Sequence, residues 1–450
     1  MQRSTDVLTH LLLGMIVVVP ASQVAAKTPI DYFQPTPIVS PLTSNAWGAQ
    51  AVLPRDVDNG IEDKTNKTWS YWDGKIIQGP DGKYNLFCSR WPQQNGHSGW
   101  KGSSAIHAVS DNILGPYVDK GLLWPINQSG KGHNVTALVM PDGRYAVLVS
   151  ETRPADVFIS SSMDGPWVYQ GSMQIDSNGY KVTGLHSNLS FIVRPDGSYL
   201  AITRHGFIML STTGIMGPYK VQGNSIYPQI PGLNNSNAED PVIWYSGGKY
   251  HVTVNWWDAR QARSLISPDG IKNWTDQGLA YAPTSNIVRY TDGTVNHWYK
   301  MERPGVVIDK NGHVSHFTFA VVDTVKEVDF GNDNHNSKVI VVPFDGVAFD
   351  KDNAGTNAIL DGTRGQGSSR TSIVMHHGVY SLEYSASPTG EAEFVLYSTD
   401  GNEVARKNAM IMSGEGSLAW AELGALPKGV YFTWAKFNHS AVAGSKFVKF

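Results

Sequence analysis

Five polar residues recur at one position of a repeated strand–turn–strand pattern. Each stands eight residues before the dipeptide that turns the chain between two apolar runs; they are Asp73, Asn134, Asn188, Glu239 and Arg303. Two of them, Asp73 and Glu239, are carboxylates. Glycoside hydrolysis by inversion needs such a pair: one carboxylate activates water and one carboxylic acid protonates the leaving oxygen, with about 6.5–9.5 Å between them. The pattern therefore points to a catalytic pair contributed by distant parts of the chain.

The repeat itself predicts the elements that must position these residues. Its turn dipeptides recur at intervals of 61, 54, 51 and 64 residues; they are Asp81-Gly82, Asp142-Gly143, Asp196-Gly197, Gly247-Gly248 and Asn311-Gly312. Asx-Gly and Gly-Gly supply the positive φ angles of tight hairpins. A unit of about four strands repeated five times head to tail predicts a five-bladed β-propeller. A long β-sandwich or β-helix is the alternative, and residues 337–343 and 48–53 are the candidates for a strand that closes the ring.

In a propeller the loops before the inner strands converge around one axis, so the recurring residues are expected to surround a pocket. Several neighbours are expected to contact a substrate there or to adjust the pKa of the acid; they are Trp72, Arg90, Trp91, His133, Asn134, His186, Asn188, Arg204, Asp240, Trp256, Glu302 and Arg303. Indole faces stack on sugar rings. The competing interpretation is that the carboxylates cap strands or hold an ion, and that the tryptophans pack between blades.

Composition narrows the function classes. The 450 residues carry a net charge of −3, which excludes an extended basic surface for nucleic acid. Cys88 is the only cysteine, so the chain has no internal disulfide, and we expect it to be a small buried residue. The histidines lack the spacing of a zinc site. No cofactor is predicted, although a structural calcium ion in the propeller channel is left open.

The ends of the chain differ in texture from the repeats. Residues 1–26 have a basic start, a short apolar run and small residues before position 27, which is typical of a secretory signal peptide. No later segment is a candidate membrane span. We expect the propeller over residues 27–349, a polar, glycine-rich linker over 350–370 and a small antiparallel β-sandwich over 371–450.

Two motifs resemble glycoside hydrolase family 43 and its five-bladed relatives. WDGKIIQGPDGKYNLF, from Trp72, resembles the motif that carries the family's base, and Glu239-Asp240-Pro241 resembles its Glu-Gly-Pro acid motif. The resemblance covers roughly residues 47–343 and implies that Asp73 is the base and Glu239 the acid. The family's third carboxylate, which adjusts the pKa of the acid, would fall near Asn188. Asp240 or Glu302 is expected to replace it, or the mechanism differs.

These observations predict a secreted, exo-acting, inverting glycoside hydrolase that acts on side chains of a plant or algal polysaccharide. Two other classes fit the same residues. A propeller polysaccharide lyase would use His133 or His186 as base and an arginine to neutralise a uronate. A non-catalytic glycan-binding propeller would explain the missing third carboxylate.

Overall fold

The computed structural model describes residues 27–354 and 370–449, with short gaps at 377–378, 387–389, 399–401, 412–413, 428 and 438–439. The expected signal peptide and most of the expected linker lie outside these residues. Contacts divide the chain into two units, residues 1–357 and 358–450, which are described separately.

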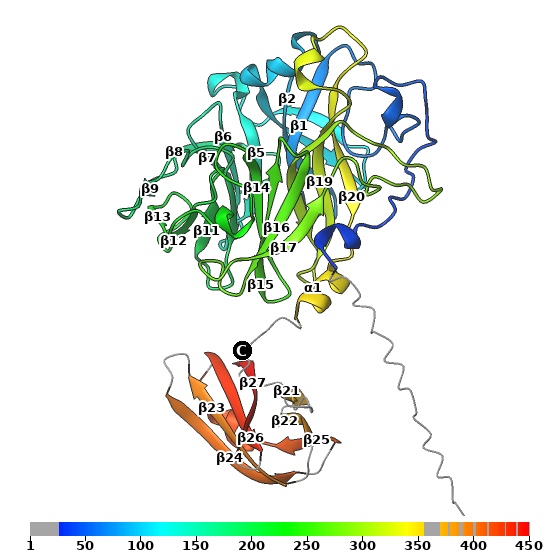
Figure 1. The fold of residues 1–450 in the computed structure, drawn as a ribbon. Helices are drawn as coiled ribbons and strands as arrows, with labels where there is room; N and C mark the ends of the chain where they lie inside the picture. The colour runs from blue at the N-terminus through cyan, green and yellow to red at the C-terminus, as the bar shows by residue number, and fades with distance from the viewer. Residues whose placement is uncertain are drawn as a thin grey trace, which may run out of the picture. The chain divides into compact units, whose positions relative to one another are not determined.

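The first unit is a five-bladed β-propeller, as predicted (Figure 1). Blade one contains β1 (Trp69–Gln78), β2 (Tyr84–Pro92), β3 (Ser104–Ser110) and β4 (Val118–Leu122), and blade two contains β5 (His133–Val139), β6 (Tyr145–Ser150), β7 (Asp156–Ser160) and β8 (Val168–Ser172). Blade three contains β10 (Ser190–Val193), β11 (Tyr199–Ile202), β12 (Ile208–Ser211) and β13 (Tyr219–Val221), with the short β9 (Ile175–Asp176) parallel to its outer strand. Blade four contains β14 (Ala238–Ser246), β15 (Lys249–Trp256), β16 (Gln261–Ser267) and β17 (Thr275–Tyr281), and blade five contains β18 (Lys300–Ile308), β19 (Val314–Val322) and β20 (Ser337–Pro343).

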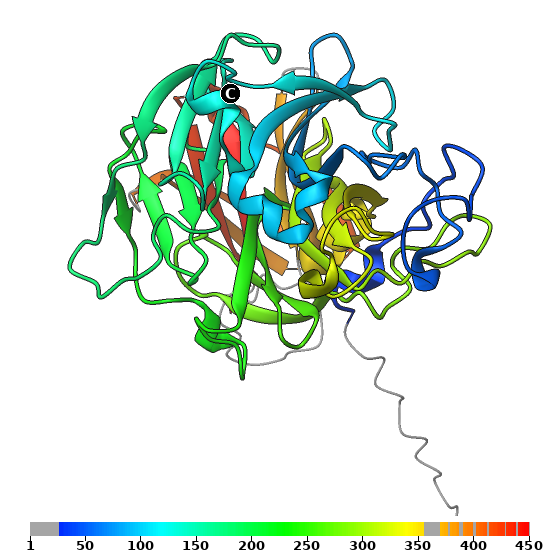
Figure 2. The ribbon, with the colours of Figure 1, turned by 90° about the horizontal axis from the view of Figure 1, so that it is seen from above.

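The inner strands form a closed ring. β1 contacts β5, β5 contacts β10, β10 contacts β14, β14 contacts β18, and β18 contacts β1. Seen from above, the chain passes around this ring from blue through green to yellow (Figure 2). Because each blade presents apolar side chains to both neighbours, one core cluster fills each of the five spaces between blades. Cys88 is fully buried in the cluster between blades one and five, as expected.

The ring is closed at blade five, where the segment before β1 covers the outer edge of β20. Residues 337–343 form β20, which pairs with β19 within blade five, so they are not a strand lent to blade one. The closing contact is instead the bridge between Ile61 and Val339 of β20. Residues 48–53 are not a closing strand, because they include the 3₁₀ turn η2 (Gln50–Val52). Beside the bridge, Glu62 pairs with Arg55 and Lys338, and all three side chains are buried.

Short helices connect the propeller strands. The 3₁₀ turns are η1 (Pro29–Tyr32), η3 (Gln93–Asn95), η4 (His97–Gly102), η5 (Gln128–Gly130), η6 (Tyr227–Gln229) and η7 (Lys326–Val328). The α-helix α1 (Gly346–Ala354) follows β20. Residues 350–354 of the expected linker therefore belong to a helix, and Asp350 anchors it by accepting hydrogen bonds from Ser246 and pairing with His313.

The second unit contains two antiparallel sheets. One has the order β21 (Arg370–His376), β22 (Val379–Ala386), β25 (Gly414–Ala419), and the other β24 (Glu403–Ile411), β23 (Gly390–Ser398), β26 (Gly429–Phe437), β27 (Ser440–Lys449). Residues of both sheets, together with the 3₁₀ turn η8 (Ala421–Ala425), share one apolar core.

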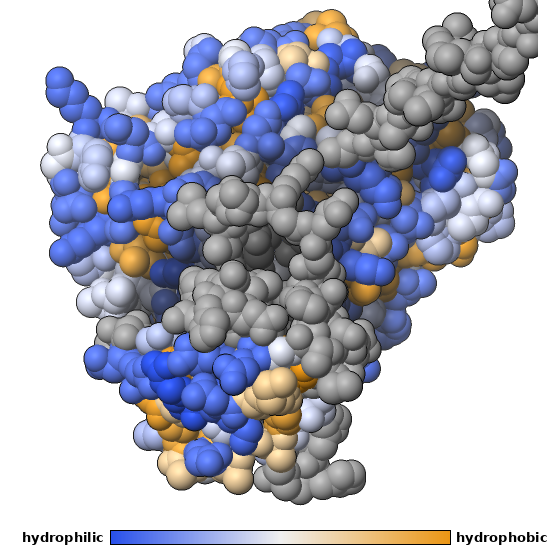
Figure 3. All heavy atoms as spheres, turned by 60° about the horizontal axis from the view of Figure 1, so that its bottom comes forward, coloured by the Kyte–Doolittle hydropathy of each residue, from blue (hydrophilic) through white to orange (hydrophobic). Residues whose placement is uncertain are grey.

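The described residues contain no helix with the length and apolar character needed to cross a membrane. On the face drawn in Figure 3, hydrophilic residues predominate and hydrophobic ones are scattered among them.

Candidate active site

A residue with left-handed backbone stands at the start of the inner strand of every blade. The five residues have φ between 46° and 52°; they are Asp73, Asn134, Asn188, Asp240 and Arg303. Positive φ is uncommon outside glycine. In four blades the residue lies in a β-bulge, which re-aims side chains at a strand end. The five side chains are buried, and we call them the axial ring.

The ring corrects the sequence alignment in blade four. The predicted member was Glu239, but the residue with the ring conformation is Asp240. The reason is the hairpin that follows: β14 and β15 are joined by the two residues Gly247 and Gly248, whereas β1 and β2 are joined by five. Matching Gly-Gly to Asx-Gly therefore shifts this blade by one position. Glu239 corresponds instead to Trp72, His133 and Glu302, which precede the ring residues of their blades.

Residues of the ring, and residues that precede it in four blades, line a pocket of about 180 Å³. Its lining comes from all five blades: Trp72, His97, Trp100, His133, Asn134, Glu151, Asn188, Arg204, Glu239, Asp240, Glu302 and Lys326. The pocket is smaller than the roughly 300–1,000 Å³ of a site for a drug-sized ligand. Its size suits one small polar unit, such as a single sugar residue.

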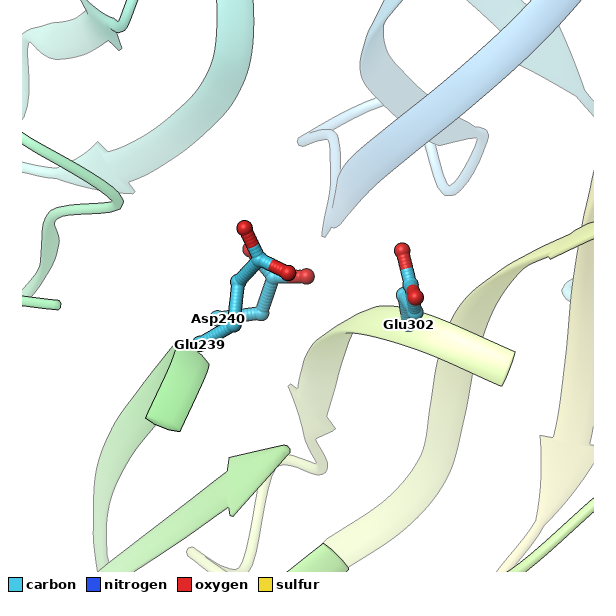
Figure 4. A group of neighbouring side chains, drawn as sticks. All are labelled: Glu239, Asp240 and Glu302. Atoms are coloured by element: carbon cyan, nitrogen blue, oxygen red, sulfur yellow. The ribbon is translucent and has the colours of Figure 1, made fainter. Parts of the chain in front are cut away.

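Three carboxylates meet in this pocket (Figure 4). Glu239 and Asp240 come from the start of β14, and Glu302 faces them from β18; each offers an oxygen within 4.8 Å of the others. Four cations surround them. Arg204 Nη2 lies 3.5 Å from Glu239 Oε1, Lys300 Nζ lies 3.4 Å from Glu302 Oε1, Lys326 pairs with the other oxygen of Glu302, and Arg303 pairs with Asp240.

The surroundings push the pKa values of the two glutamates apart. Burial and the neighbouring Glu302 raise the pKa of Glu239 above its ordinary value, against the opposing effect of the cations. Burial also disfavours the charged form of Glu302, but Lys326 and Lys300 outweigh it and lower the pKa of Glu302. The pocket therefore favours protonation of Glu239 over protonation of Glu302. A carboxylic acid next to a carboxylate is the pairing that general acid catalysis requires.

The carboxylate cluster has the oxygen ligands that a hard cation prefers. Among the described residues, it is the one group of acidic, histidine or cysteine side chains close enough together to hold a metal ion. The Lys326 ammonium group already pairs with Glu302 in this space, and the same carboxylates raise the pKa of Lys326. The cluster therefore has its own internal cation.

Aromatic rings also line the pocket. Trp72 is covered by Lys326, whose Nζ lies 4.9 Å from the ring centroid, and by the edge of His97. Trp100 is half-buried and lies over His133, with ring centroids 5.0 Å apart. Burial lowers the pKa of His97 and of His133 well below the ordinary value, and the nearby cations add to the effect. Both histidines are therefore neutral groups at neutral pH.

Asp73 lies in the axial ring and is not among the residues that line the pocket. Its side chain is buried, its Oδ1 accepts a hydrogen bond from the Ser89 amide at 2.9 Å, and its Oδ2 accepts one from the Ser89 hydroxyl. Burial raises the pKa of Asp73 to about 7, although Arg303, Ser89 and the Val135 amide oppose the rise. A pocket water activated by Asp73 would therefore have to reach a buried carboxylate whose two oxygens already accept hydrogen bonds from Ser89.

The other predicted site residues separate into two groups. Trp72, His133, Asn134, Asn188, Arg204, Asp240 and Glu302 line the pocket, and Arg303 stands in the ring beside it. Four do not line it. Arg90 pairs with Asp119, Trp91 is buried behind Trp72 and His97, Trp256 packs in the core between blades three and four, and His186 is exposed.

Sequence reasoning missed Lys326 and Glu151. Lys326 belongs to η7, in the connection from β19 to β20, where no repeat pattern marks it. Glu151 directly follows β6 and accepts hydrogen bonds from the Ser187 hydroxyl and the Asn188 amide. Glu151 follows β6 closely, as Arg204 follows β11, so its place in the repeat could have marked it.

No protein-family model matches the chain, and no curated protein matches it. Among solved structures, the chain is similar to a family 117 glycoside hydrolase of the marine bacterium Zobellia galactanivorans, with 14% identity, a TM-score of 0.43, and 63% of this chain and 87% of that one covered. It is similar to an α-L-arabinofuranosidase of Podospora anserina in complex with cellotriose, with 14% identity, a TM-score of 0.45, and 67% and 98% covered. It is also similar to an exo-β-1,3-galactanase of Phanerochaete chrysosporium with galactose, with 12% identity, a TM-score of 0.42, and 84% and 95% covered. Likenesses of this degree do not assign an activity to the chain.

Proposed function

We propose that the chain is a glycoside hydrolase in which Glu239 is the general acid and Glu302 is the ionised carboxylate. The observation that carries this proposal is the opposite pKa shift of two glutamates whose oxygens lie within 4.8 Å across one pocket. Glycosidases divide acid and carboxylate roles between two carboxyl groups in this way.

The reaction follows from these roles. Glu302 attacks the anomeric carbon while Glu239 gives its proton to the leaving oxygen, and a covalent glycosyl–enzyme forms. Glu239, now ionised, takes a proton from water, and the hydroxide displaces Glu302 and restores both groups. The close approach of the two glutamates is nearer to the roughly 5–5.5 Å of retaining enzymes than to the 6.5–9.5 Å of inverting ones. The inversion predicted from the sequence depends on Asp73 as base, and it is the competing version of this proposal.

The pocket also bears on the substrate. A volume of about 180 Å³ holds one sugar residue, which supports action on the end of a chain. Half-buried Trp100 offers an indole face, and the surrounding amide and charged groups offer hydrogen-bond partners for hydroxyls. A terminal sugar of a plant or algal polysaccharide side chain is the proposed substrate class. Secretion, expected from residues 1–26, is part of the same proposal.

A leaving-group comparison tests the proposal. The parent protein is screened on dinitrophenyl glycosides and on plant and algal oligosaccharides, and the best sugar is then used with each variant. Glu239→Gln should lose about 10²–10⁴-fold on the oligosaccharide but little on dinitrophenyl glycosides, because their leaving group needs no proton. Glu302→Gln should lose both activities. Exposed Glu327, next to Lys326, provides the control: Glu327→Gln should match the parent.

Three results would contradict the proposal. An unsaturated product absorbing in the ultraviolet would indicate a lyase, for which His133 remains in the pocket. Glycan binding without turnover in the parent would indicate a binding propeller. Net inversion, followed by NMR of the first-formed anomer, would exclude Glu302 as the nucleophile.

A further inference from the structure

We propose that the guanidinium group of Arg303 takes the place of a metal ion at the propeller axis, so that the axial ring is held together without a bound cation. This inference concerns the fold and is independent of the proposed activity. It answers, as a proposal, the question that the sequence left open, whether calcium occupies the channel.

The ring has the oxygen donors of a cation site. It brings together the carboxylates of Asp73 and Asp240 and the amides of Asn134 and Asn188, each from a different blade. Calcium takes six to eight such oxygens at about 2.3–2.6 Å. The fifth blade, however, contributes Arg303, which is the only cation among these five residues.

Four of the five ring residues are hydrogen-bonded to one another, and the fifth, Asp73, is hydrogen-bonded to Ser89. Asn134 Nδ2 donates to Asn188 Oδ1 at 3.1 Å, and Asn188 Nδ2 donates to Asp240 Oδ1. Arg303 Nη1 donates to the same Asp240 oxygen at 3.4 Å, and the Arg303 amide reaches Asp240 Oδ2 at 3.4 Å. Arg303 also opposes the rise in the pKa of Asp73. One guanidinium thus balances carboxylates from two other blades.

The channel continues beyond the ring as a cavity of about 40 Å³, and its lining includes a second cation. Lys75 donates from Nζ to the Val306 carbonyl, and burial lowers the pKa of Lys75 to about 8. The acceptor of this hydrogen bond is a neutral carbonyl and not a carboxylate. A divalent ion in this cavity would be repelled by the positive charges of Arg303 and Lys75 and attracted by a single lining carboxylate, that of Asp240. The channel therefore does not fit calcium.

Thermal unfolding of the full chain at pH 8 tests the inference. The midpoint of the parent should be the same, within about 1 °C, after dialysis against EDTA and in millimolar Ca²⁺ or Mn²⁺. Arg303→Met removes the charge but keeps an apolar side chain of similar length, so two carboxylates are left unbalanced at the axis. This variant should unfold at a lower temperature, and the divalent ions should raise its midpoint by about 5 °C at a hundredfold excess over their Kd.

Arg303→Lys is the matched variant. It keeps a positive charge in the ring and should remain insensitive to both EDTA and divalent ions. A parent that loses stability in EDTA, or gains it in Ca²⁺, would overturn the inference, as would an Arg303→Met variant whose midpoint ignores the ions. If Arg303→Met does not fold, the parent and Arg303→Lys still decide, because sensitivity of either to the ions would contradict a built-in cation.

Discussion

Replacing Glu62 by glutamine should destabilise the propeller by about 3–5 kcal/mol, because it removes one partner of a buried ionic network. Glu62 Oε1 lies 3.2 Å from Arg55 Nη2, and Glu62 Oε2 lies 2.6 Å from Lys338 Nζ. None of the three side chains is more than 1% exposed. Arg55 is also held between Trp47 and Trp298, with its guanidinium 4.3 and 5.7 Å from their ring centroids. Neither cation can turn to solvent when Glu62 loses its charge.

The network joins the segment before β1 to β20, so its loss should weaken the closure of the ring. At about 2 °C per kcal/mol, the low end expected for a large domain, the midpoint of the propeller should fall by roughly 6–10 °C. Differential scanning calorimetry of the full chain measures this transition, with Asp142→Asn as control. Asp142 pairs with Arg144, both are about half exposed, and the control should leave the midpoint unchanged.

Removing the positive charge of Lys338 as well should restore part of the stability that Glu62→Gln loses. The double variant Glu62→Gln/Lys338→Met leaves only Arg55 without its partner, and burial already lowers the pKa of Lys338. It should unfold at a higher temperature than Glu62→Gln. A Glu62→Gln midpoint within 1–2 °C of the parent would refute the reasoning, because it would mean that the network does not hold the closure.

Three further predictions concern the pocket and the ring. The rate of glycoside hydrolysis should show a bell-shaped pH profile, in which the alkaline limb reports loss of the Glu239 proton. Arg204 is a cation that lowers the pKa of Glu239, so Arg204→Gln should move the alkaline limb to higher pH. Trp100→Ala should raise KM with a smaller effect on kcat if the indole binds sugar, as steady-state kinetics on the best oligosaccharide would show. Burial raises the pKa of Asp73 to about 7, so ionising this carboxyl group lowers the stability of the parent progressively as the pH rises from about 4 through 7. Asp73→Asn should therefore gain stability relative to the parent between pH 5 and pH 8. A stability difference that does not change with pH would contradict the buried placement of Asp73.

The propeller could be predicted from the sequence because its signals are local. Asx-Gly and Gly-Gly turns mark each hairpin, and alternating apolar runs mark the strands on either side. The number of blades followed from these signals, and so did the strand character of residues 337–343, although not their place in blade five. Closure by Ile61 could not be predicted, because a single bridge to Val339 leaves no alternating pattern.

The site was predicted in outline but not in its pairing. The recurring polar position did mark residues that meet at the axis, yet a hairpin of different length in blade four exchanged Glu239 for Asp240. That one-residue shift matters because Asp240 has the left-handed backbone of the ring, while both Glu239 and Asp240 line the pocket. Lys326, which helps to lower the pKa of Glu302, lies in a connection with no repeat to identify it.

The rate of hydrolysis by Glu302→Gln, set beside that of Asp73→Asn on the same dinitrophenyl glycoside, tests the central claim most directly. The account predicts a loss of about 10²-fold or more for Glu302→Gln and a much smaller change for Asp73→Asn. Parental activity in Glu302→Gln, together with an inactive Asp73→Asn of undiminished thermal stability, would contradict it.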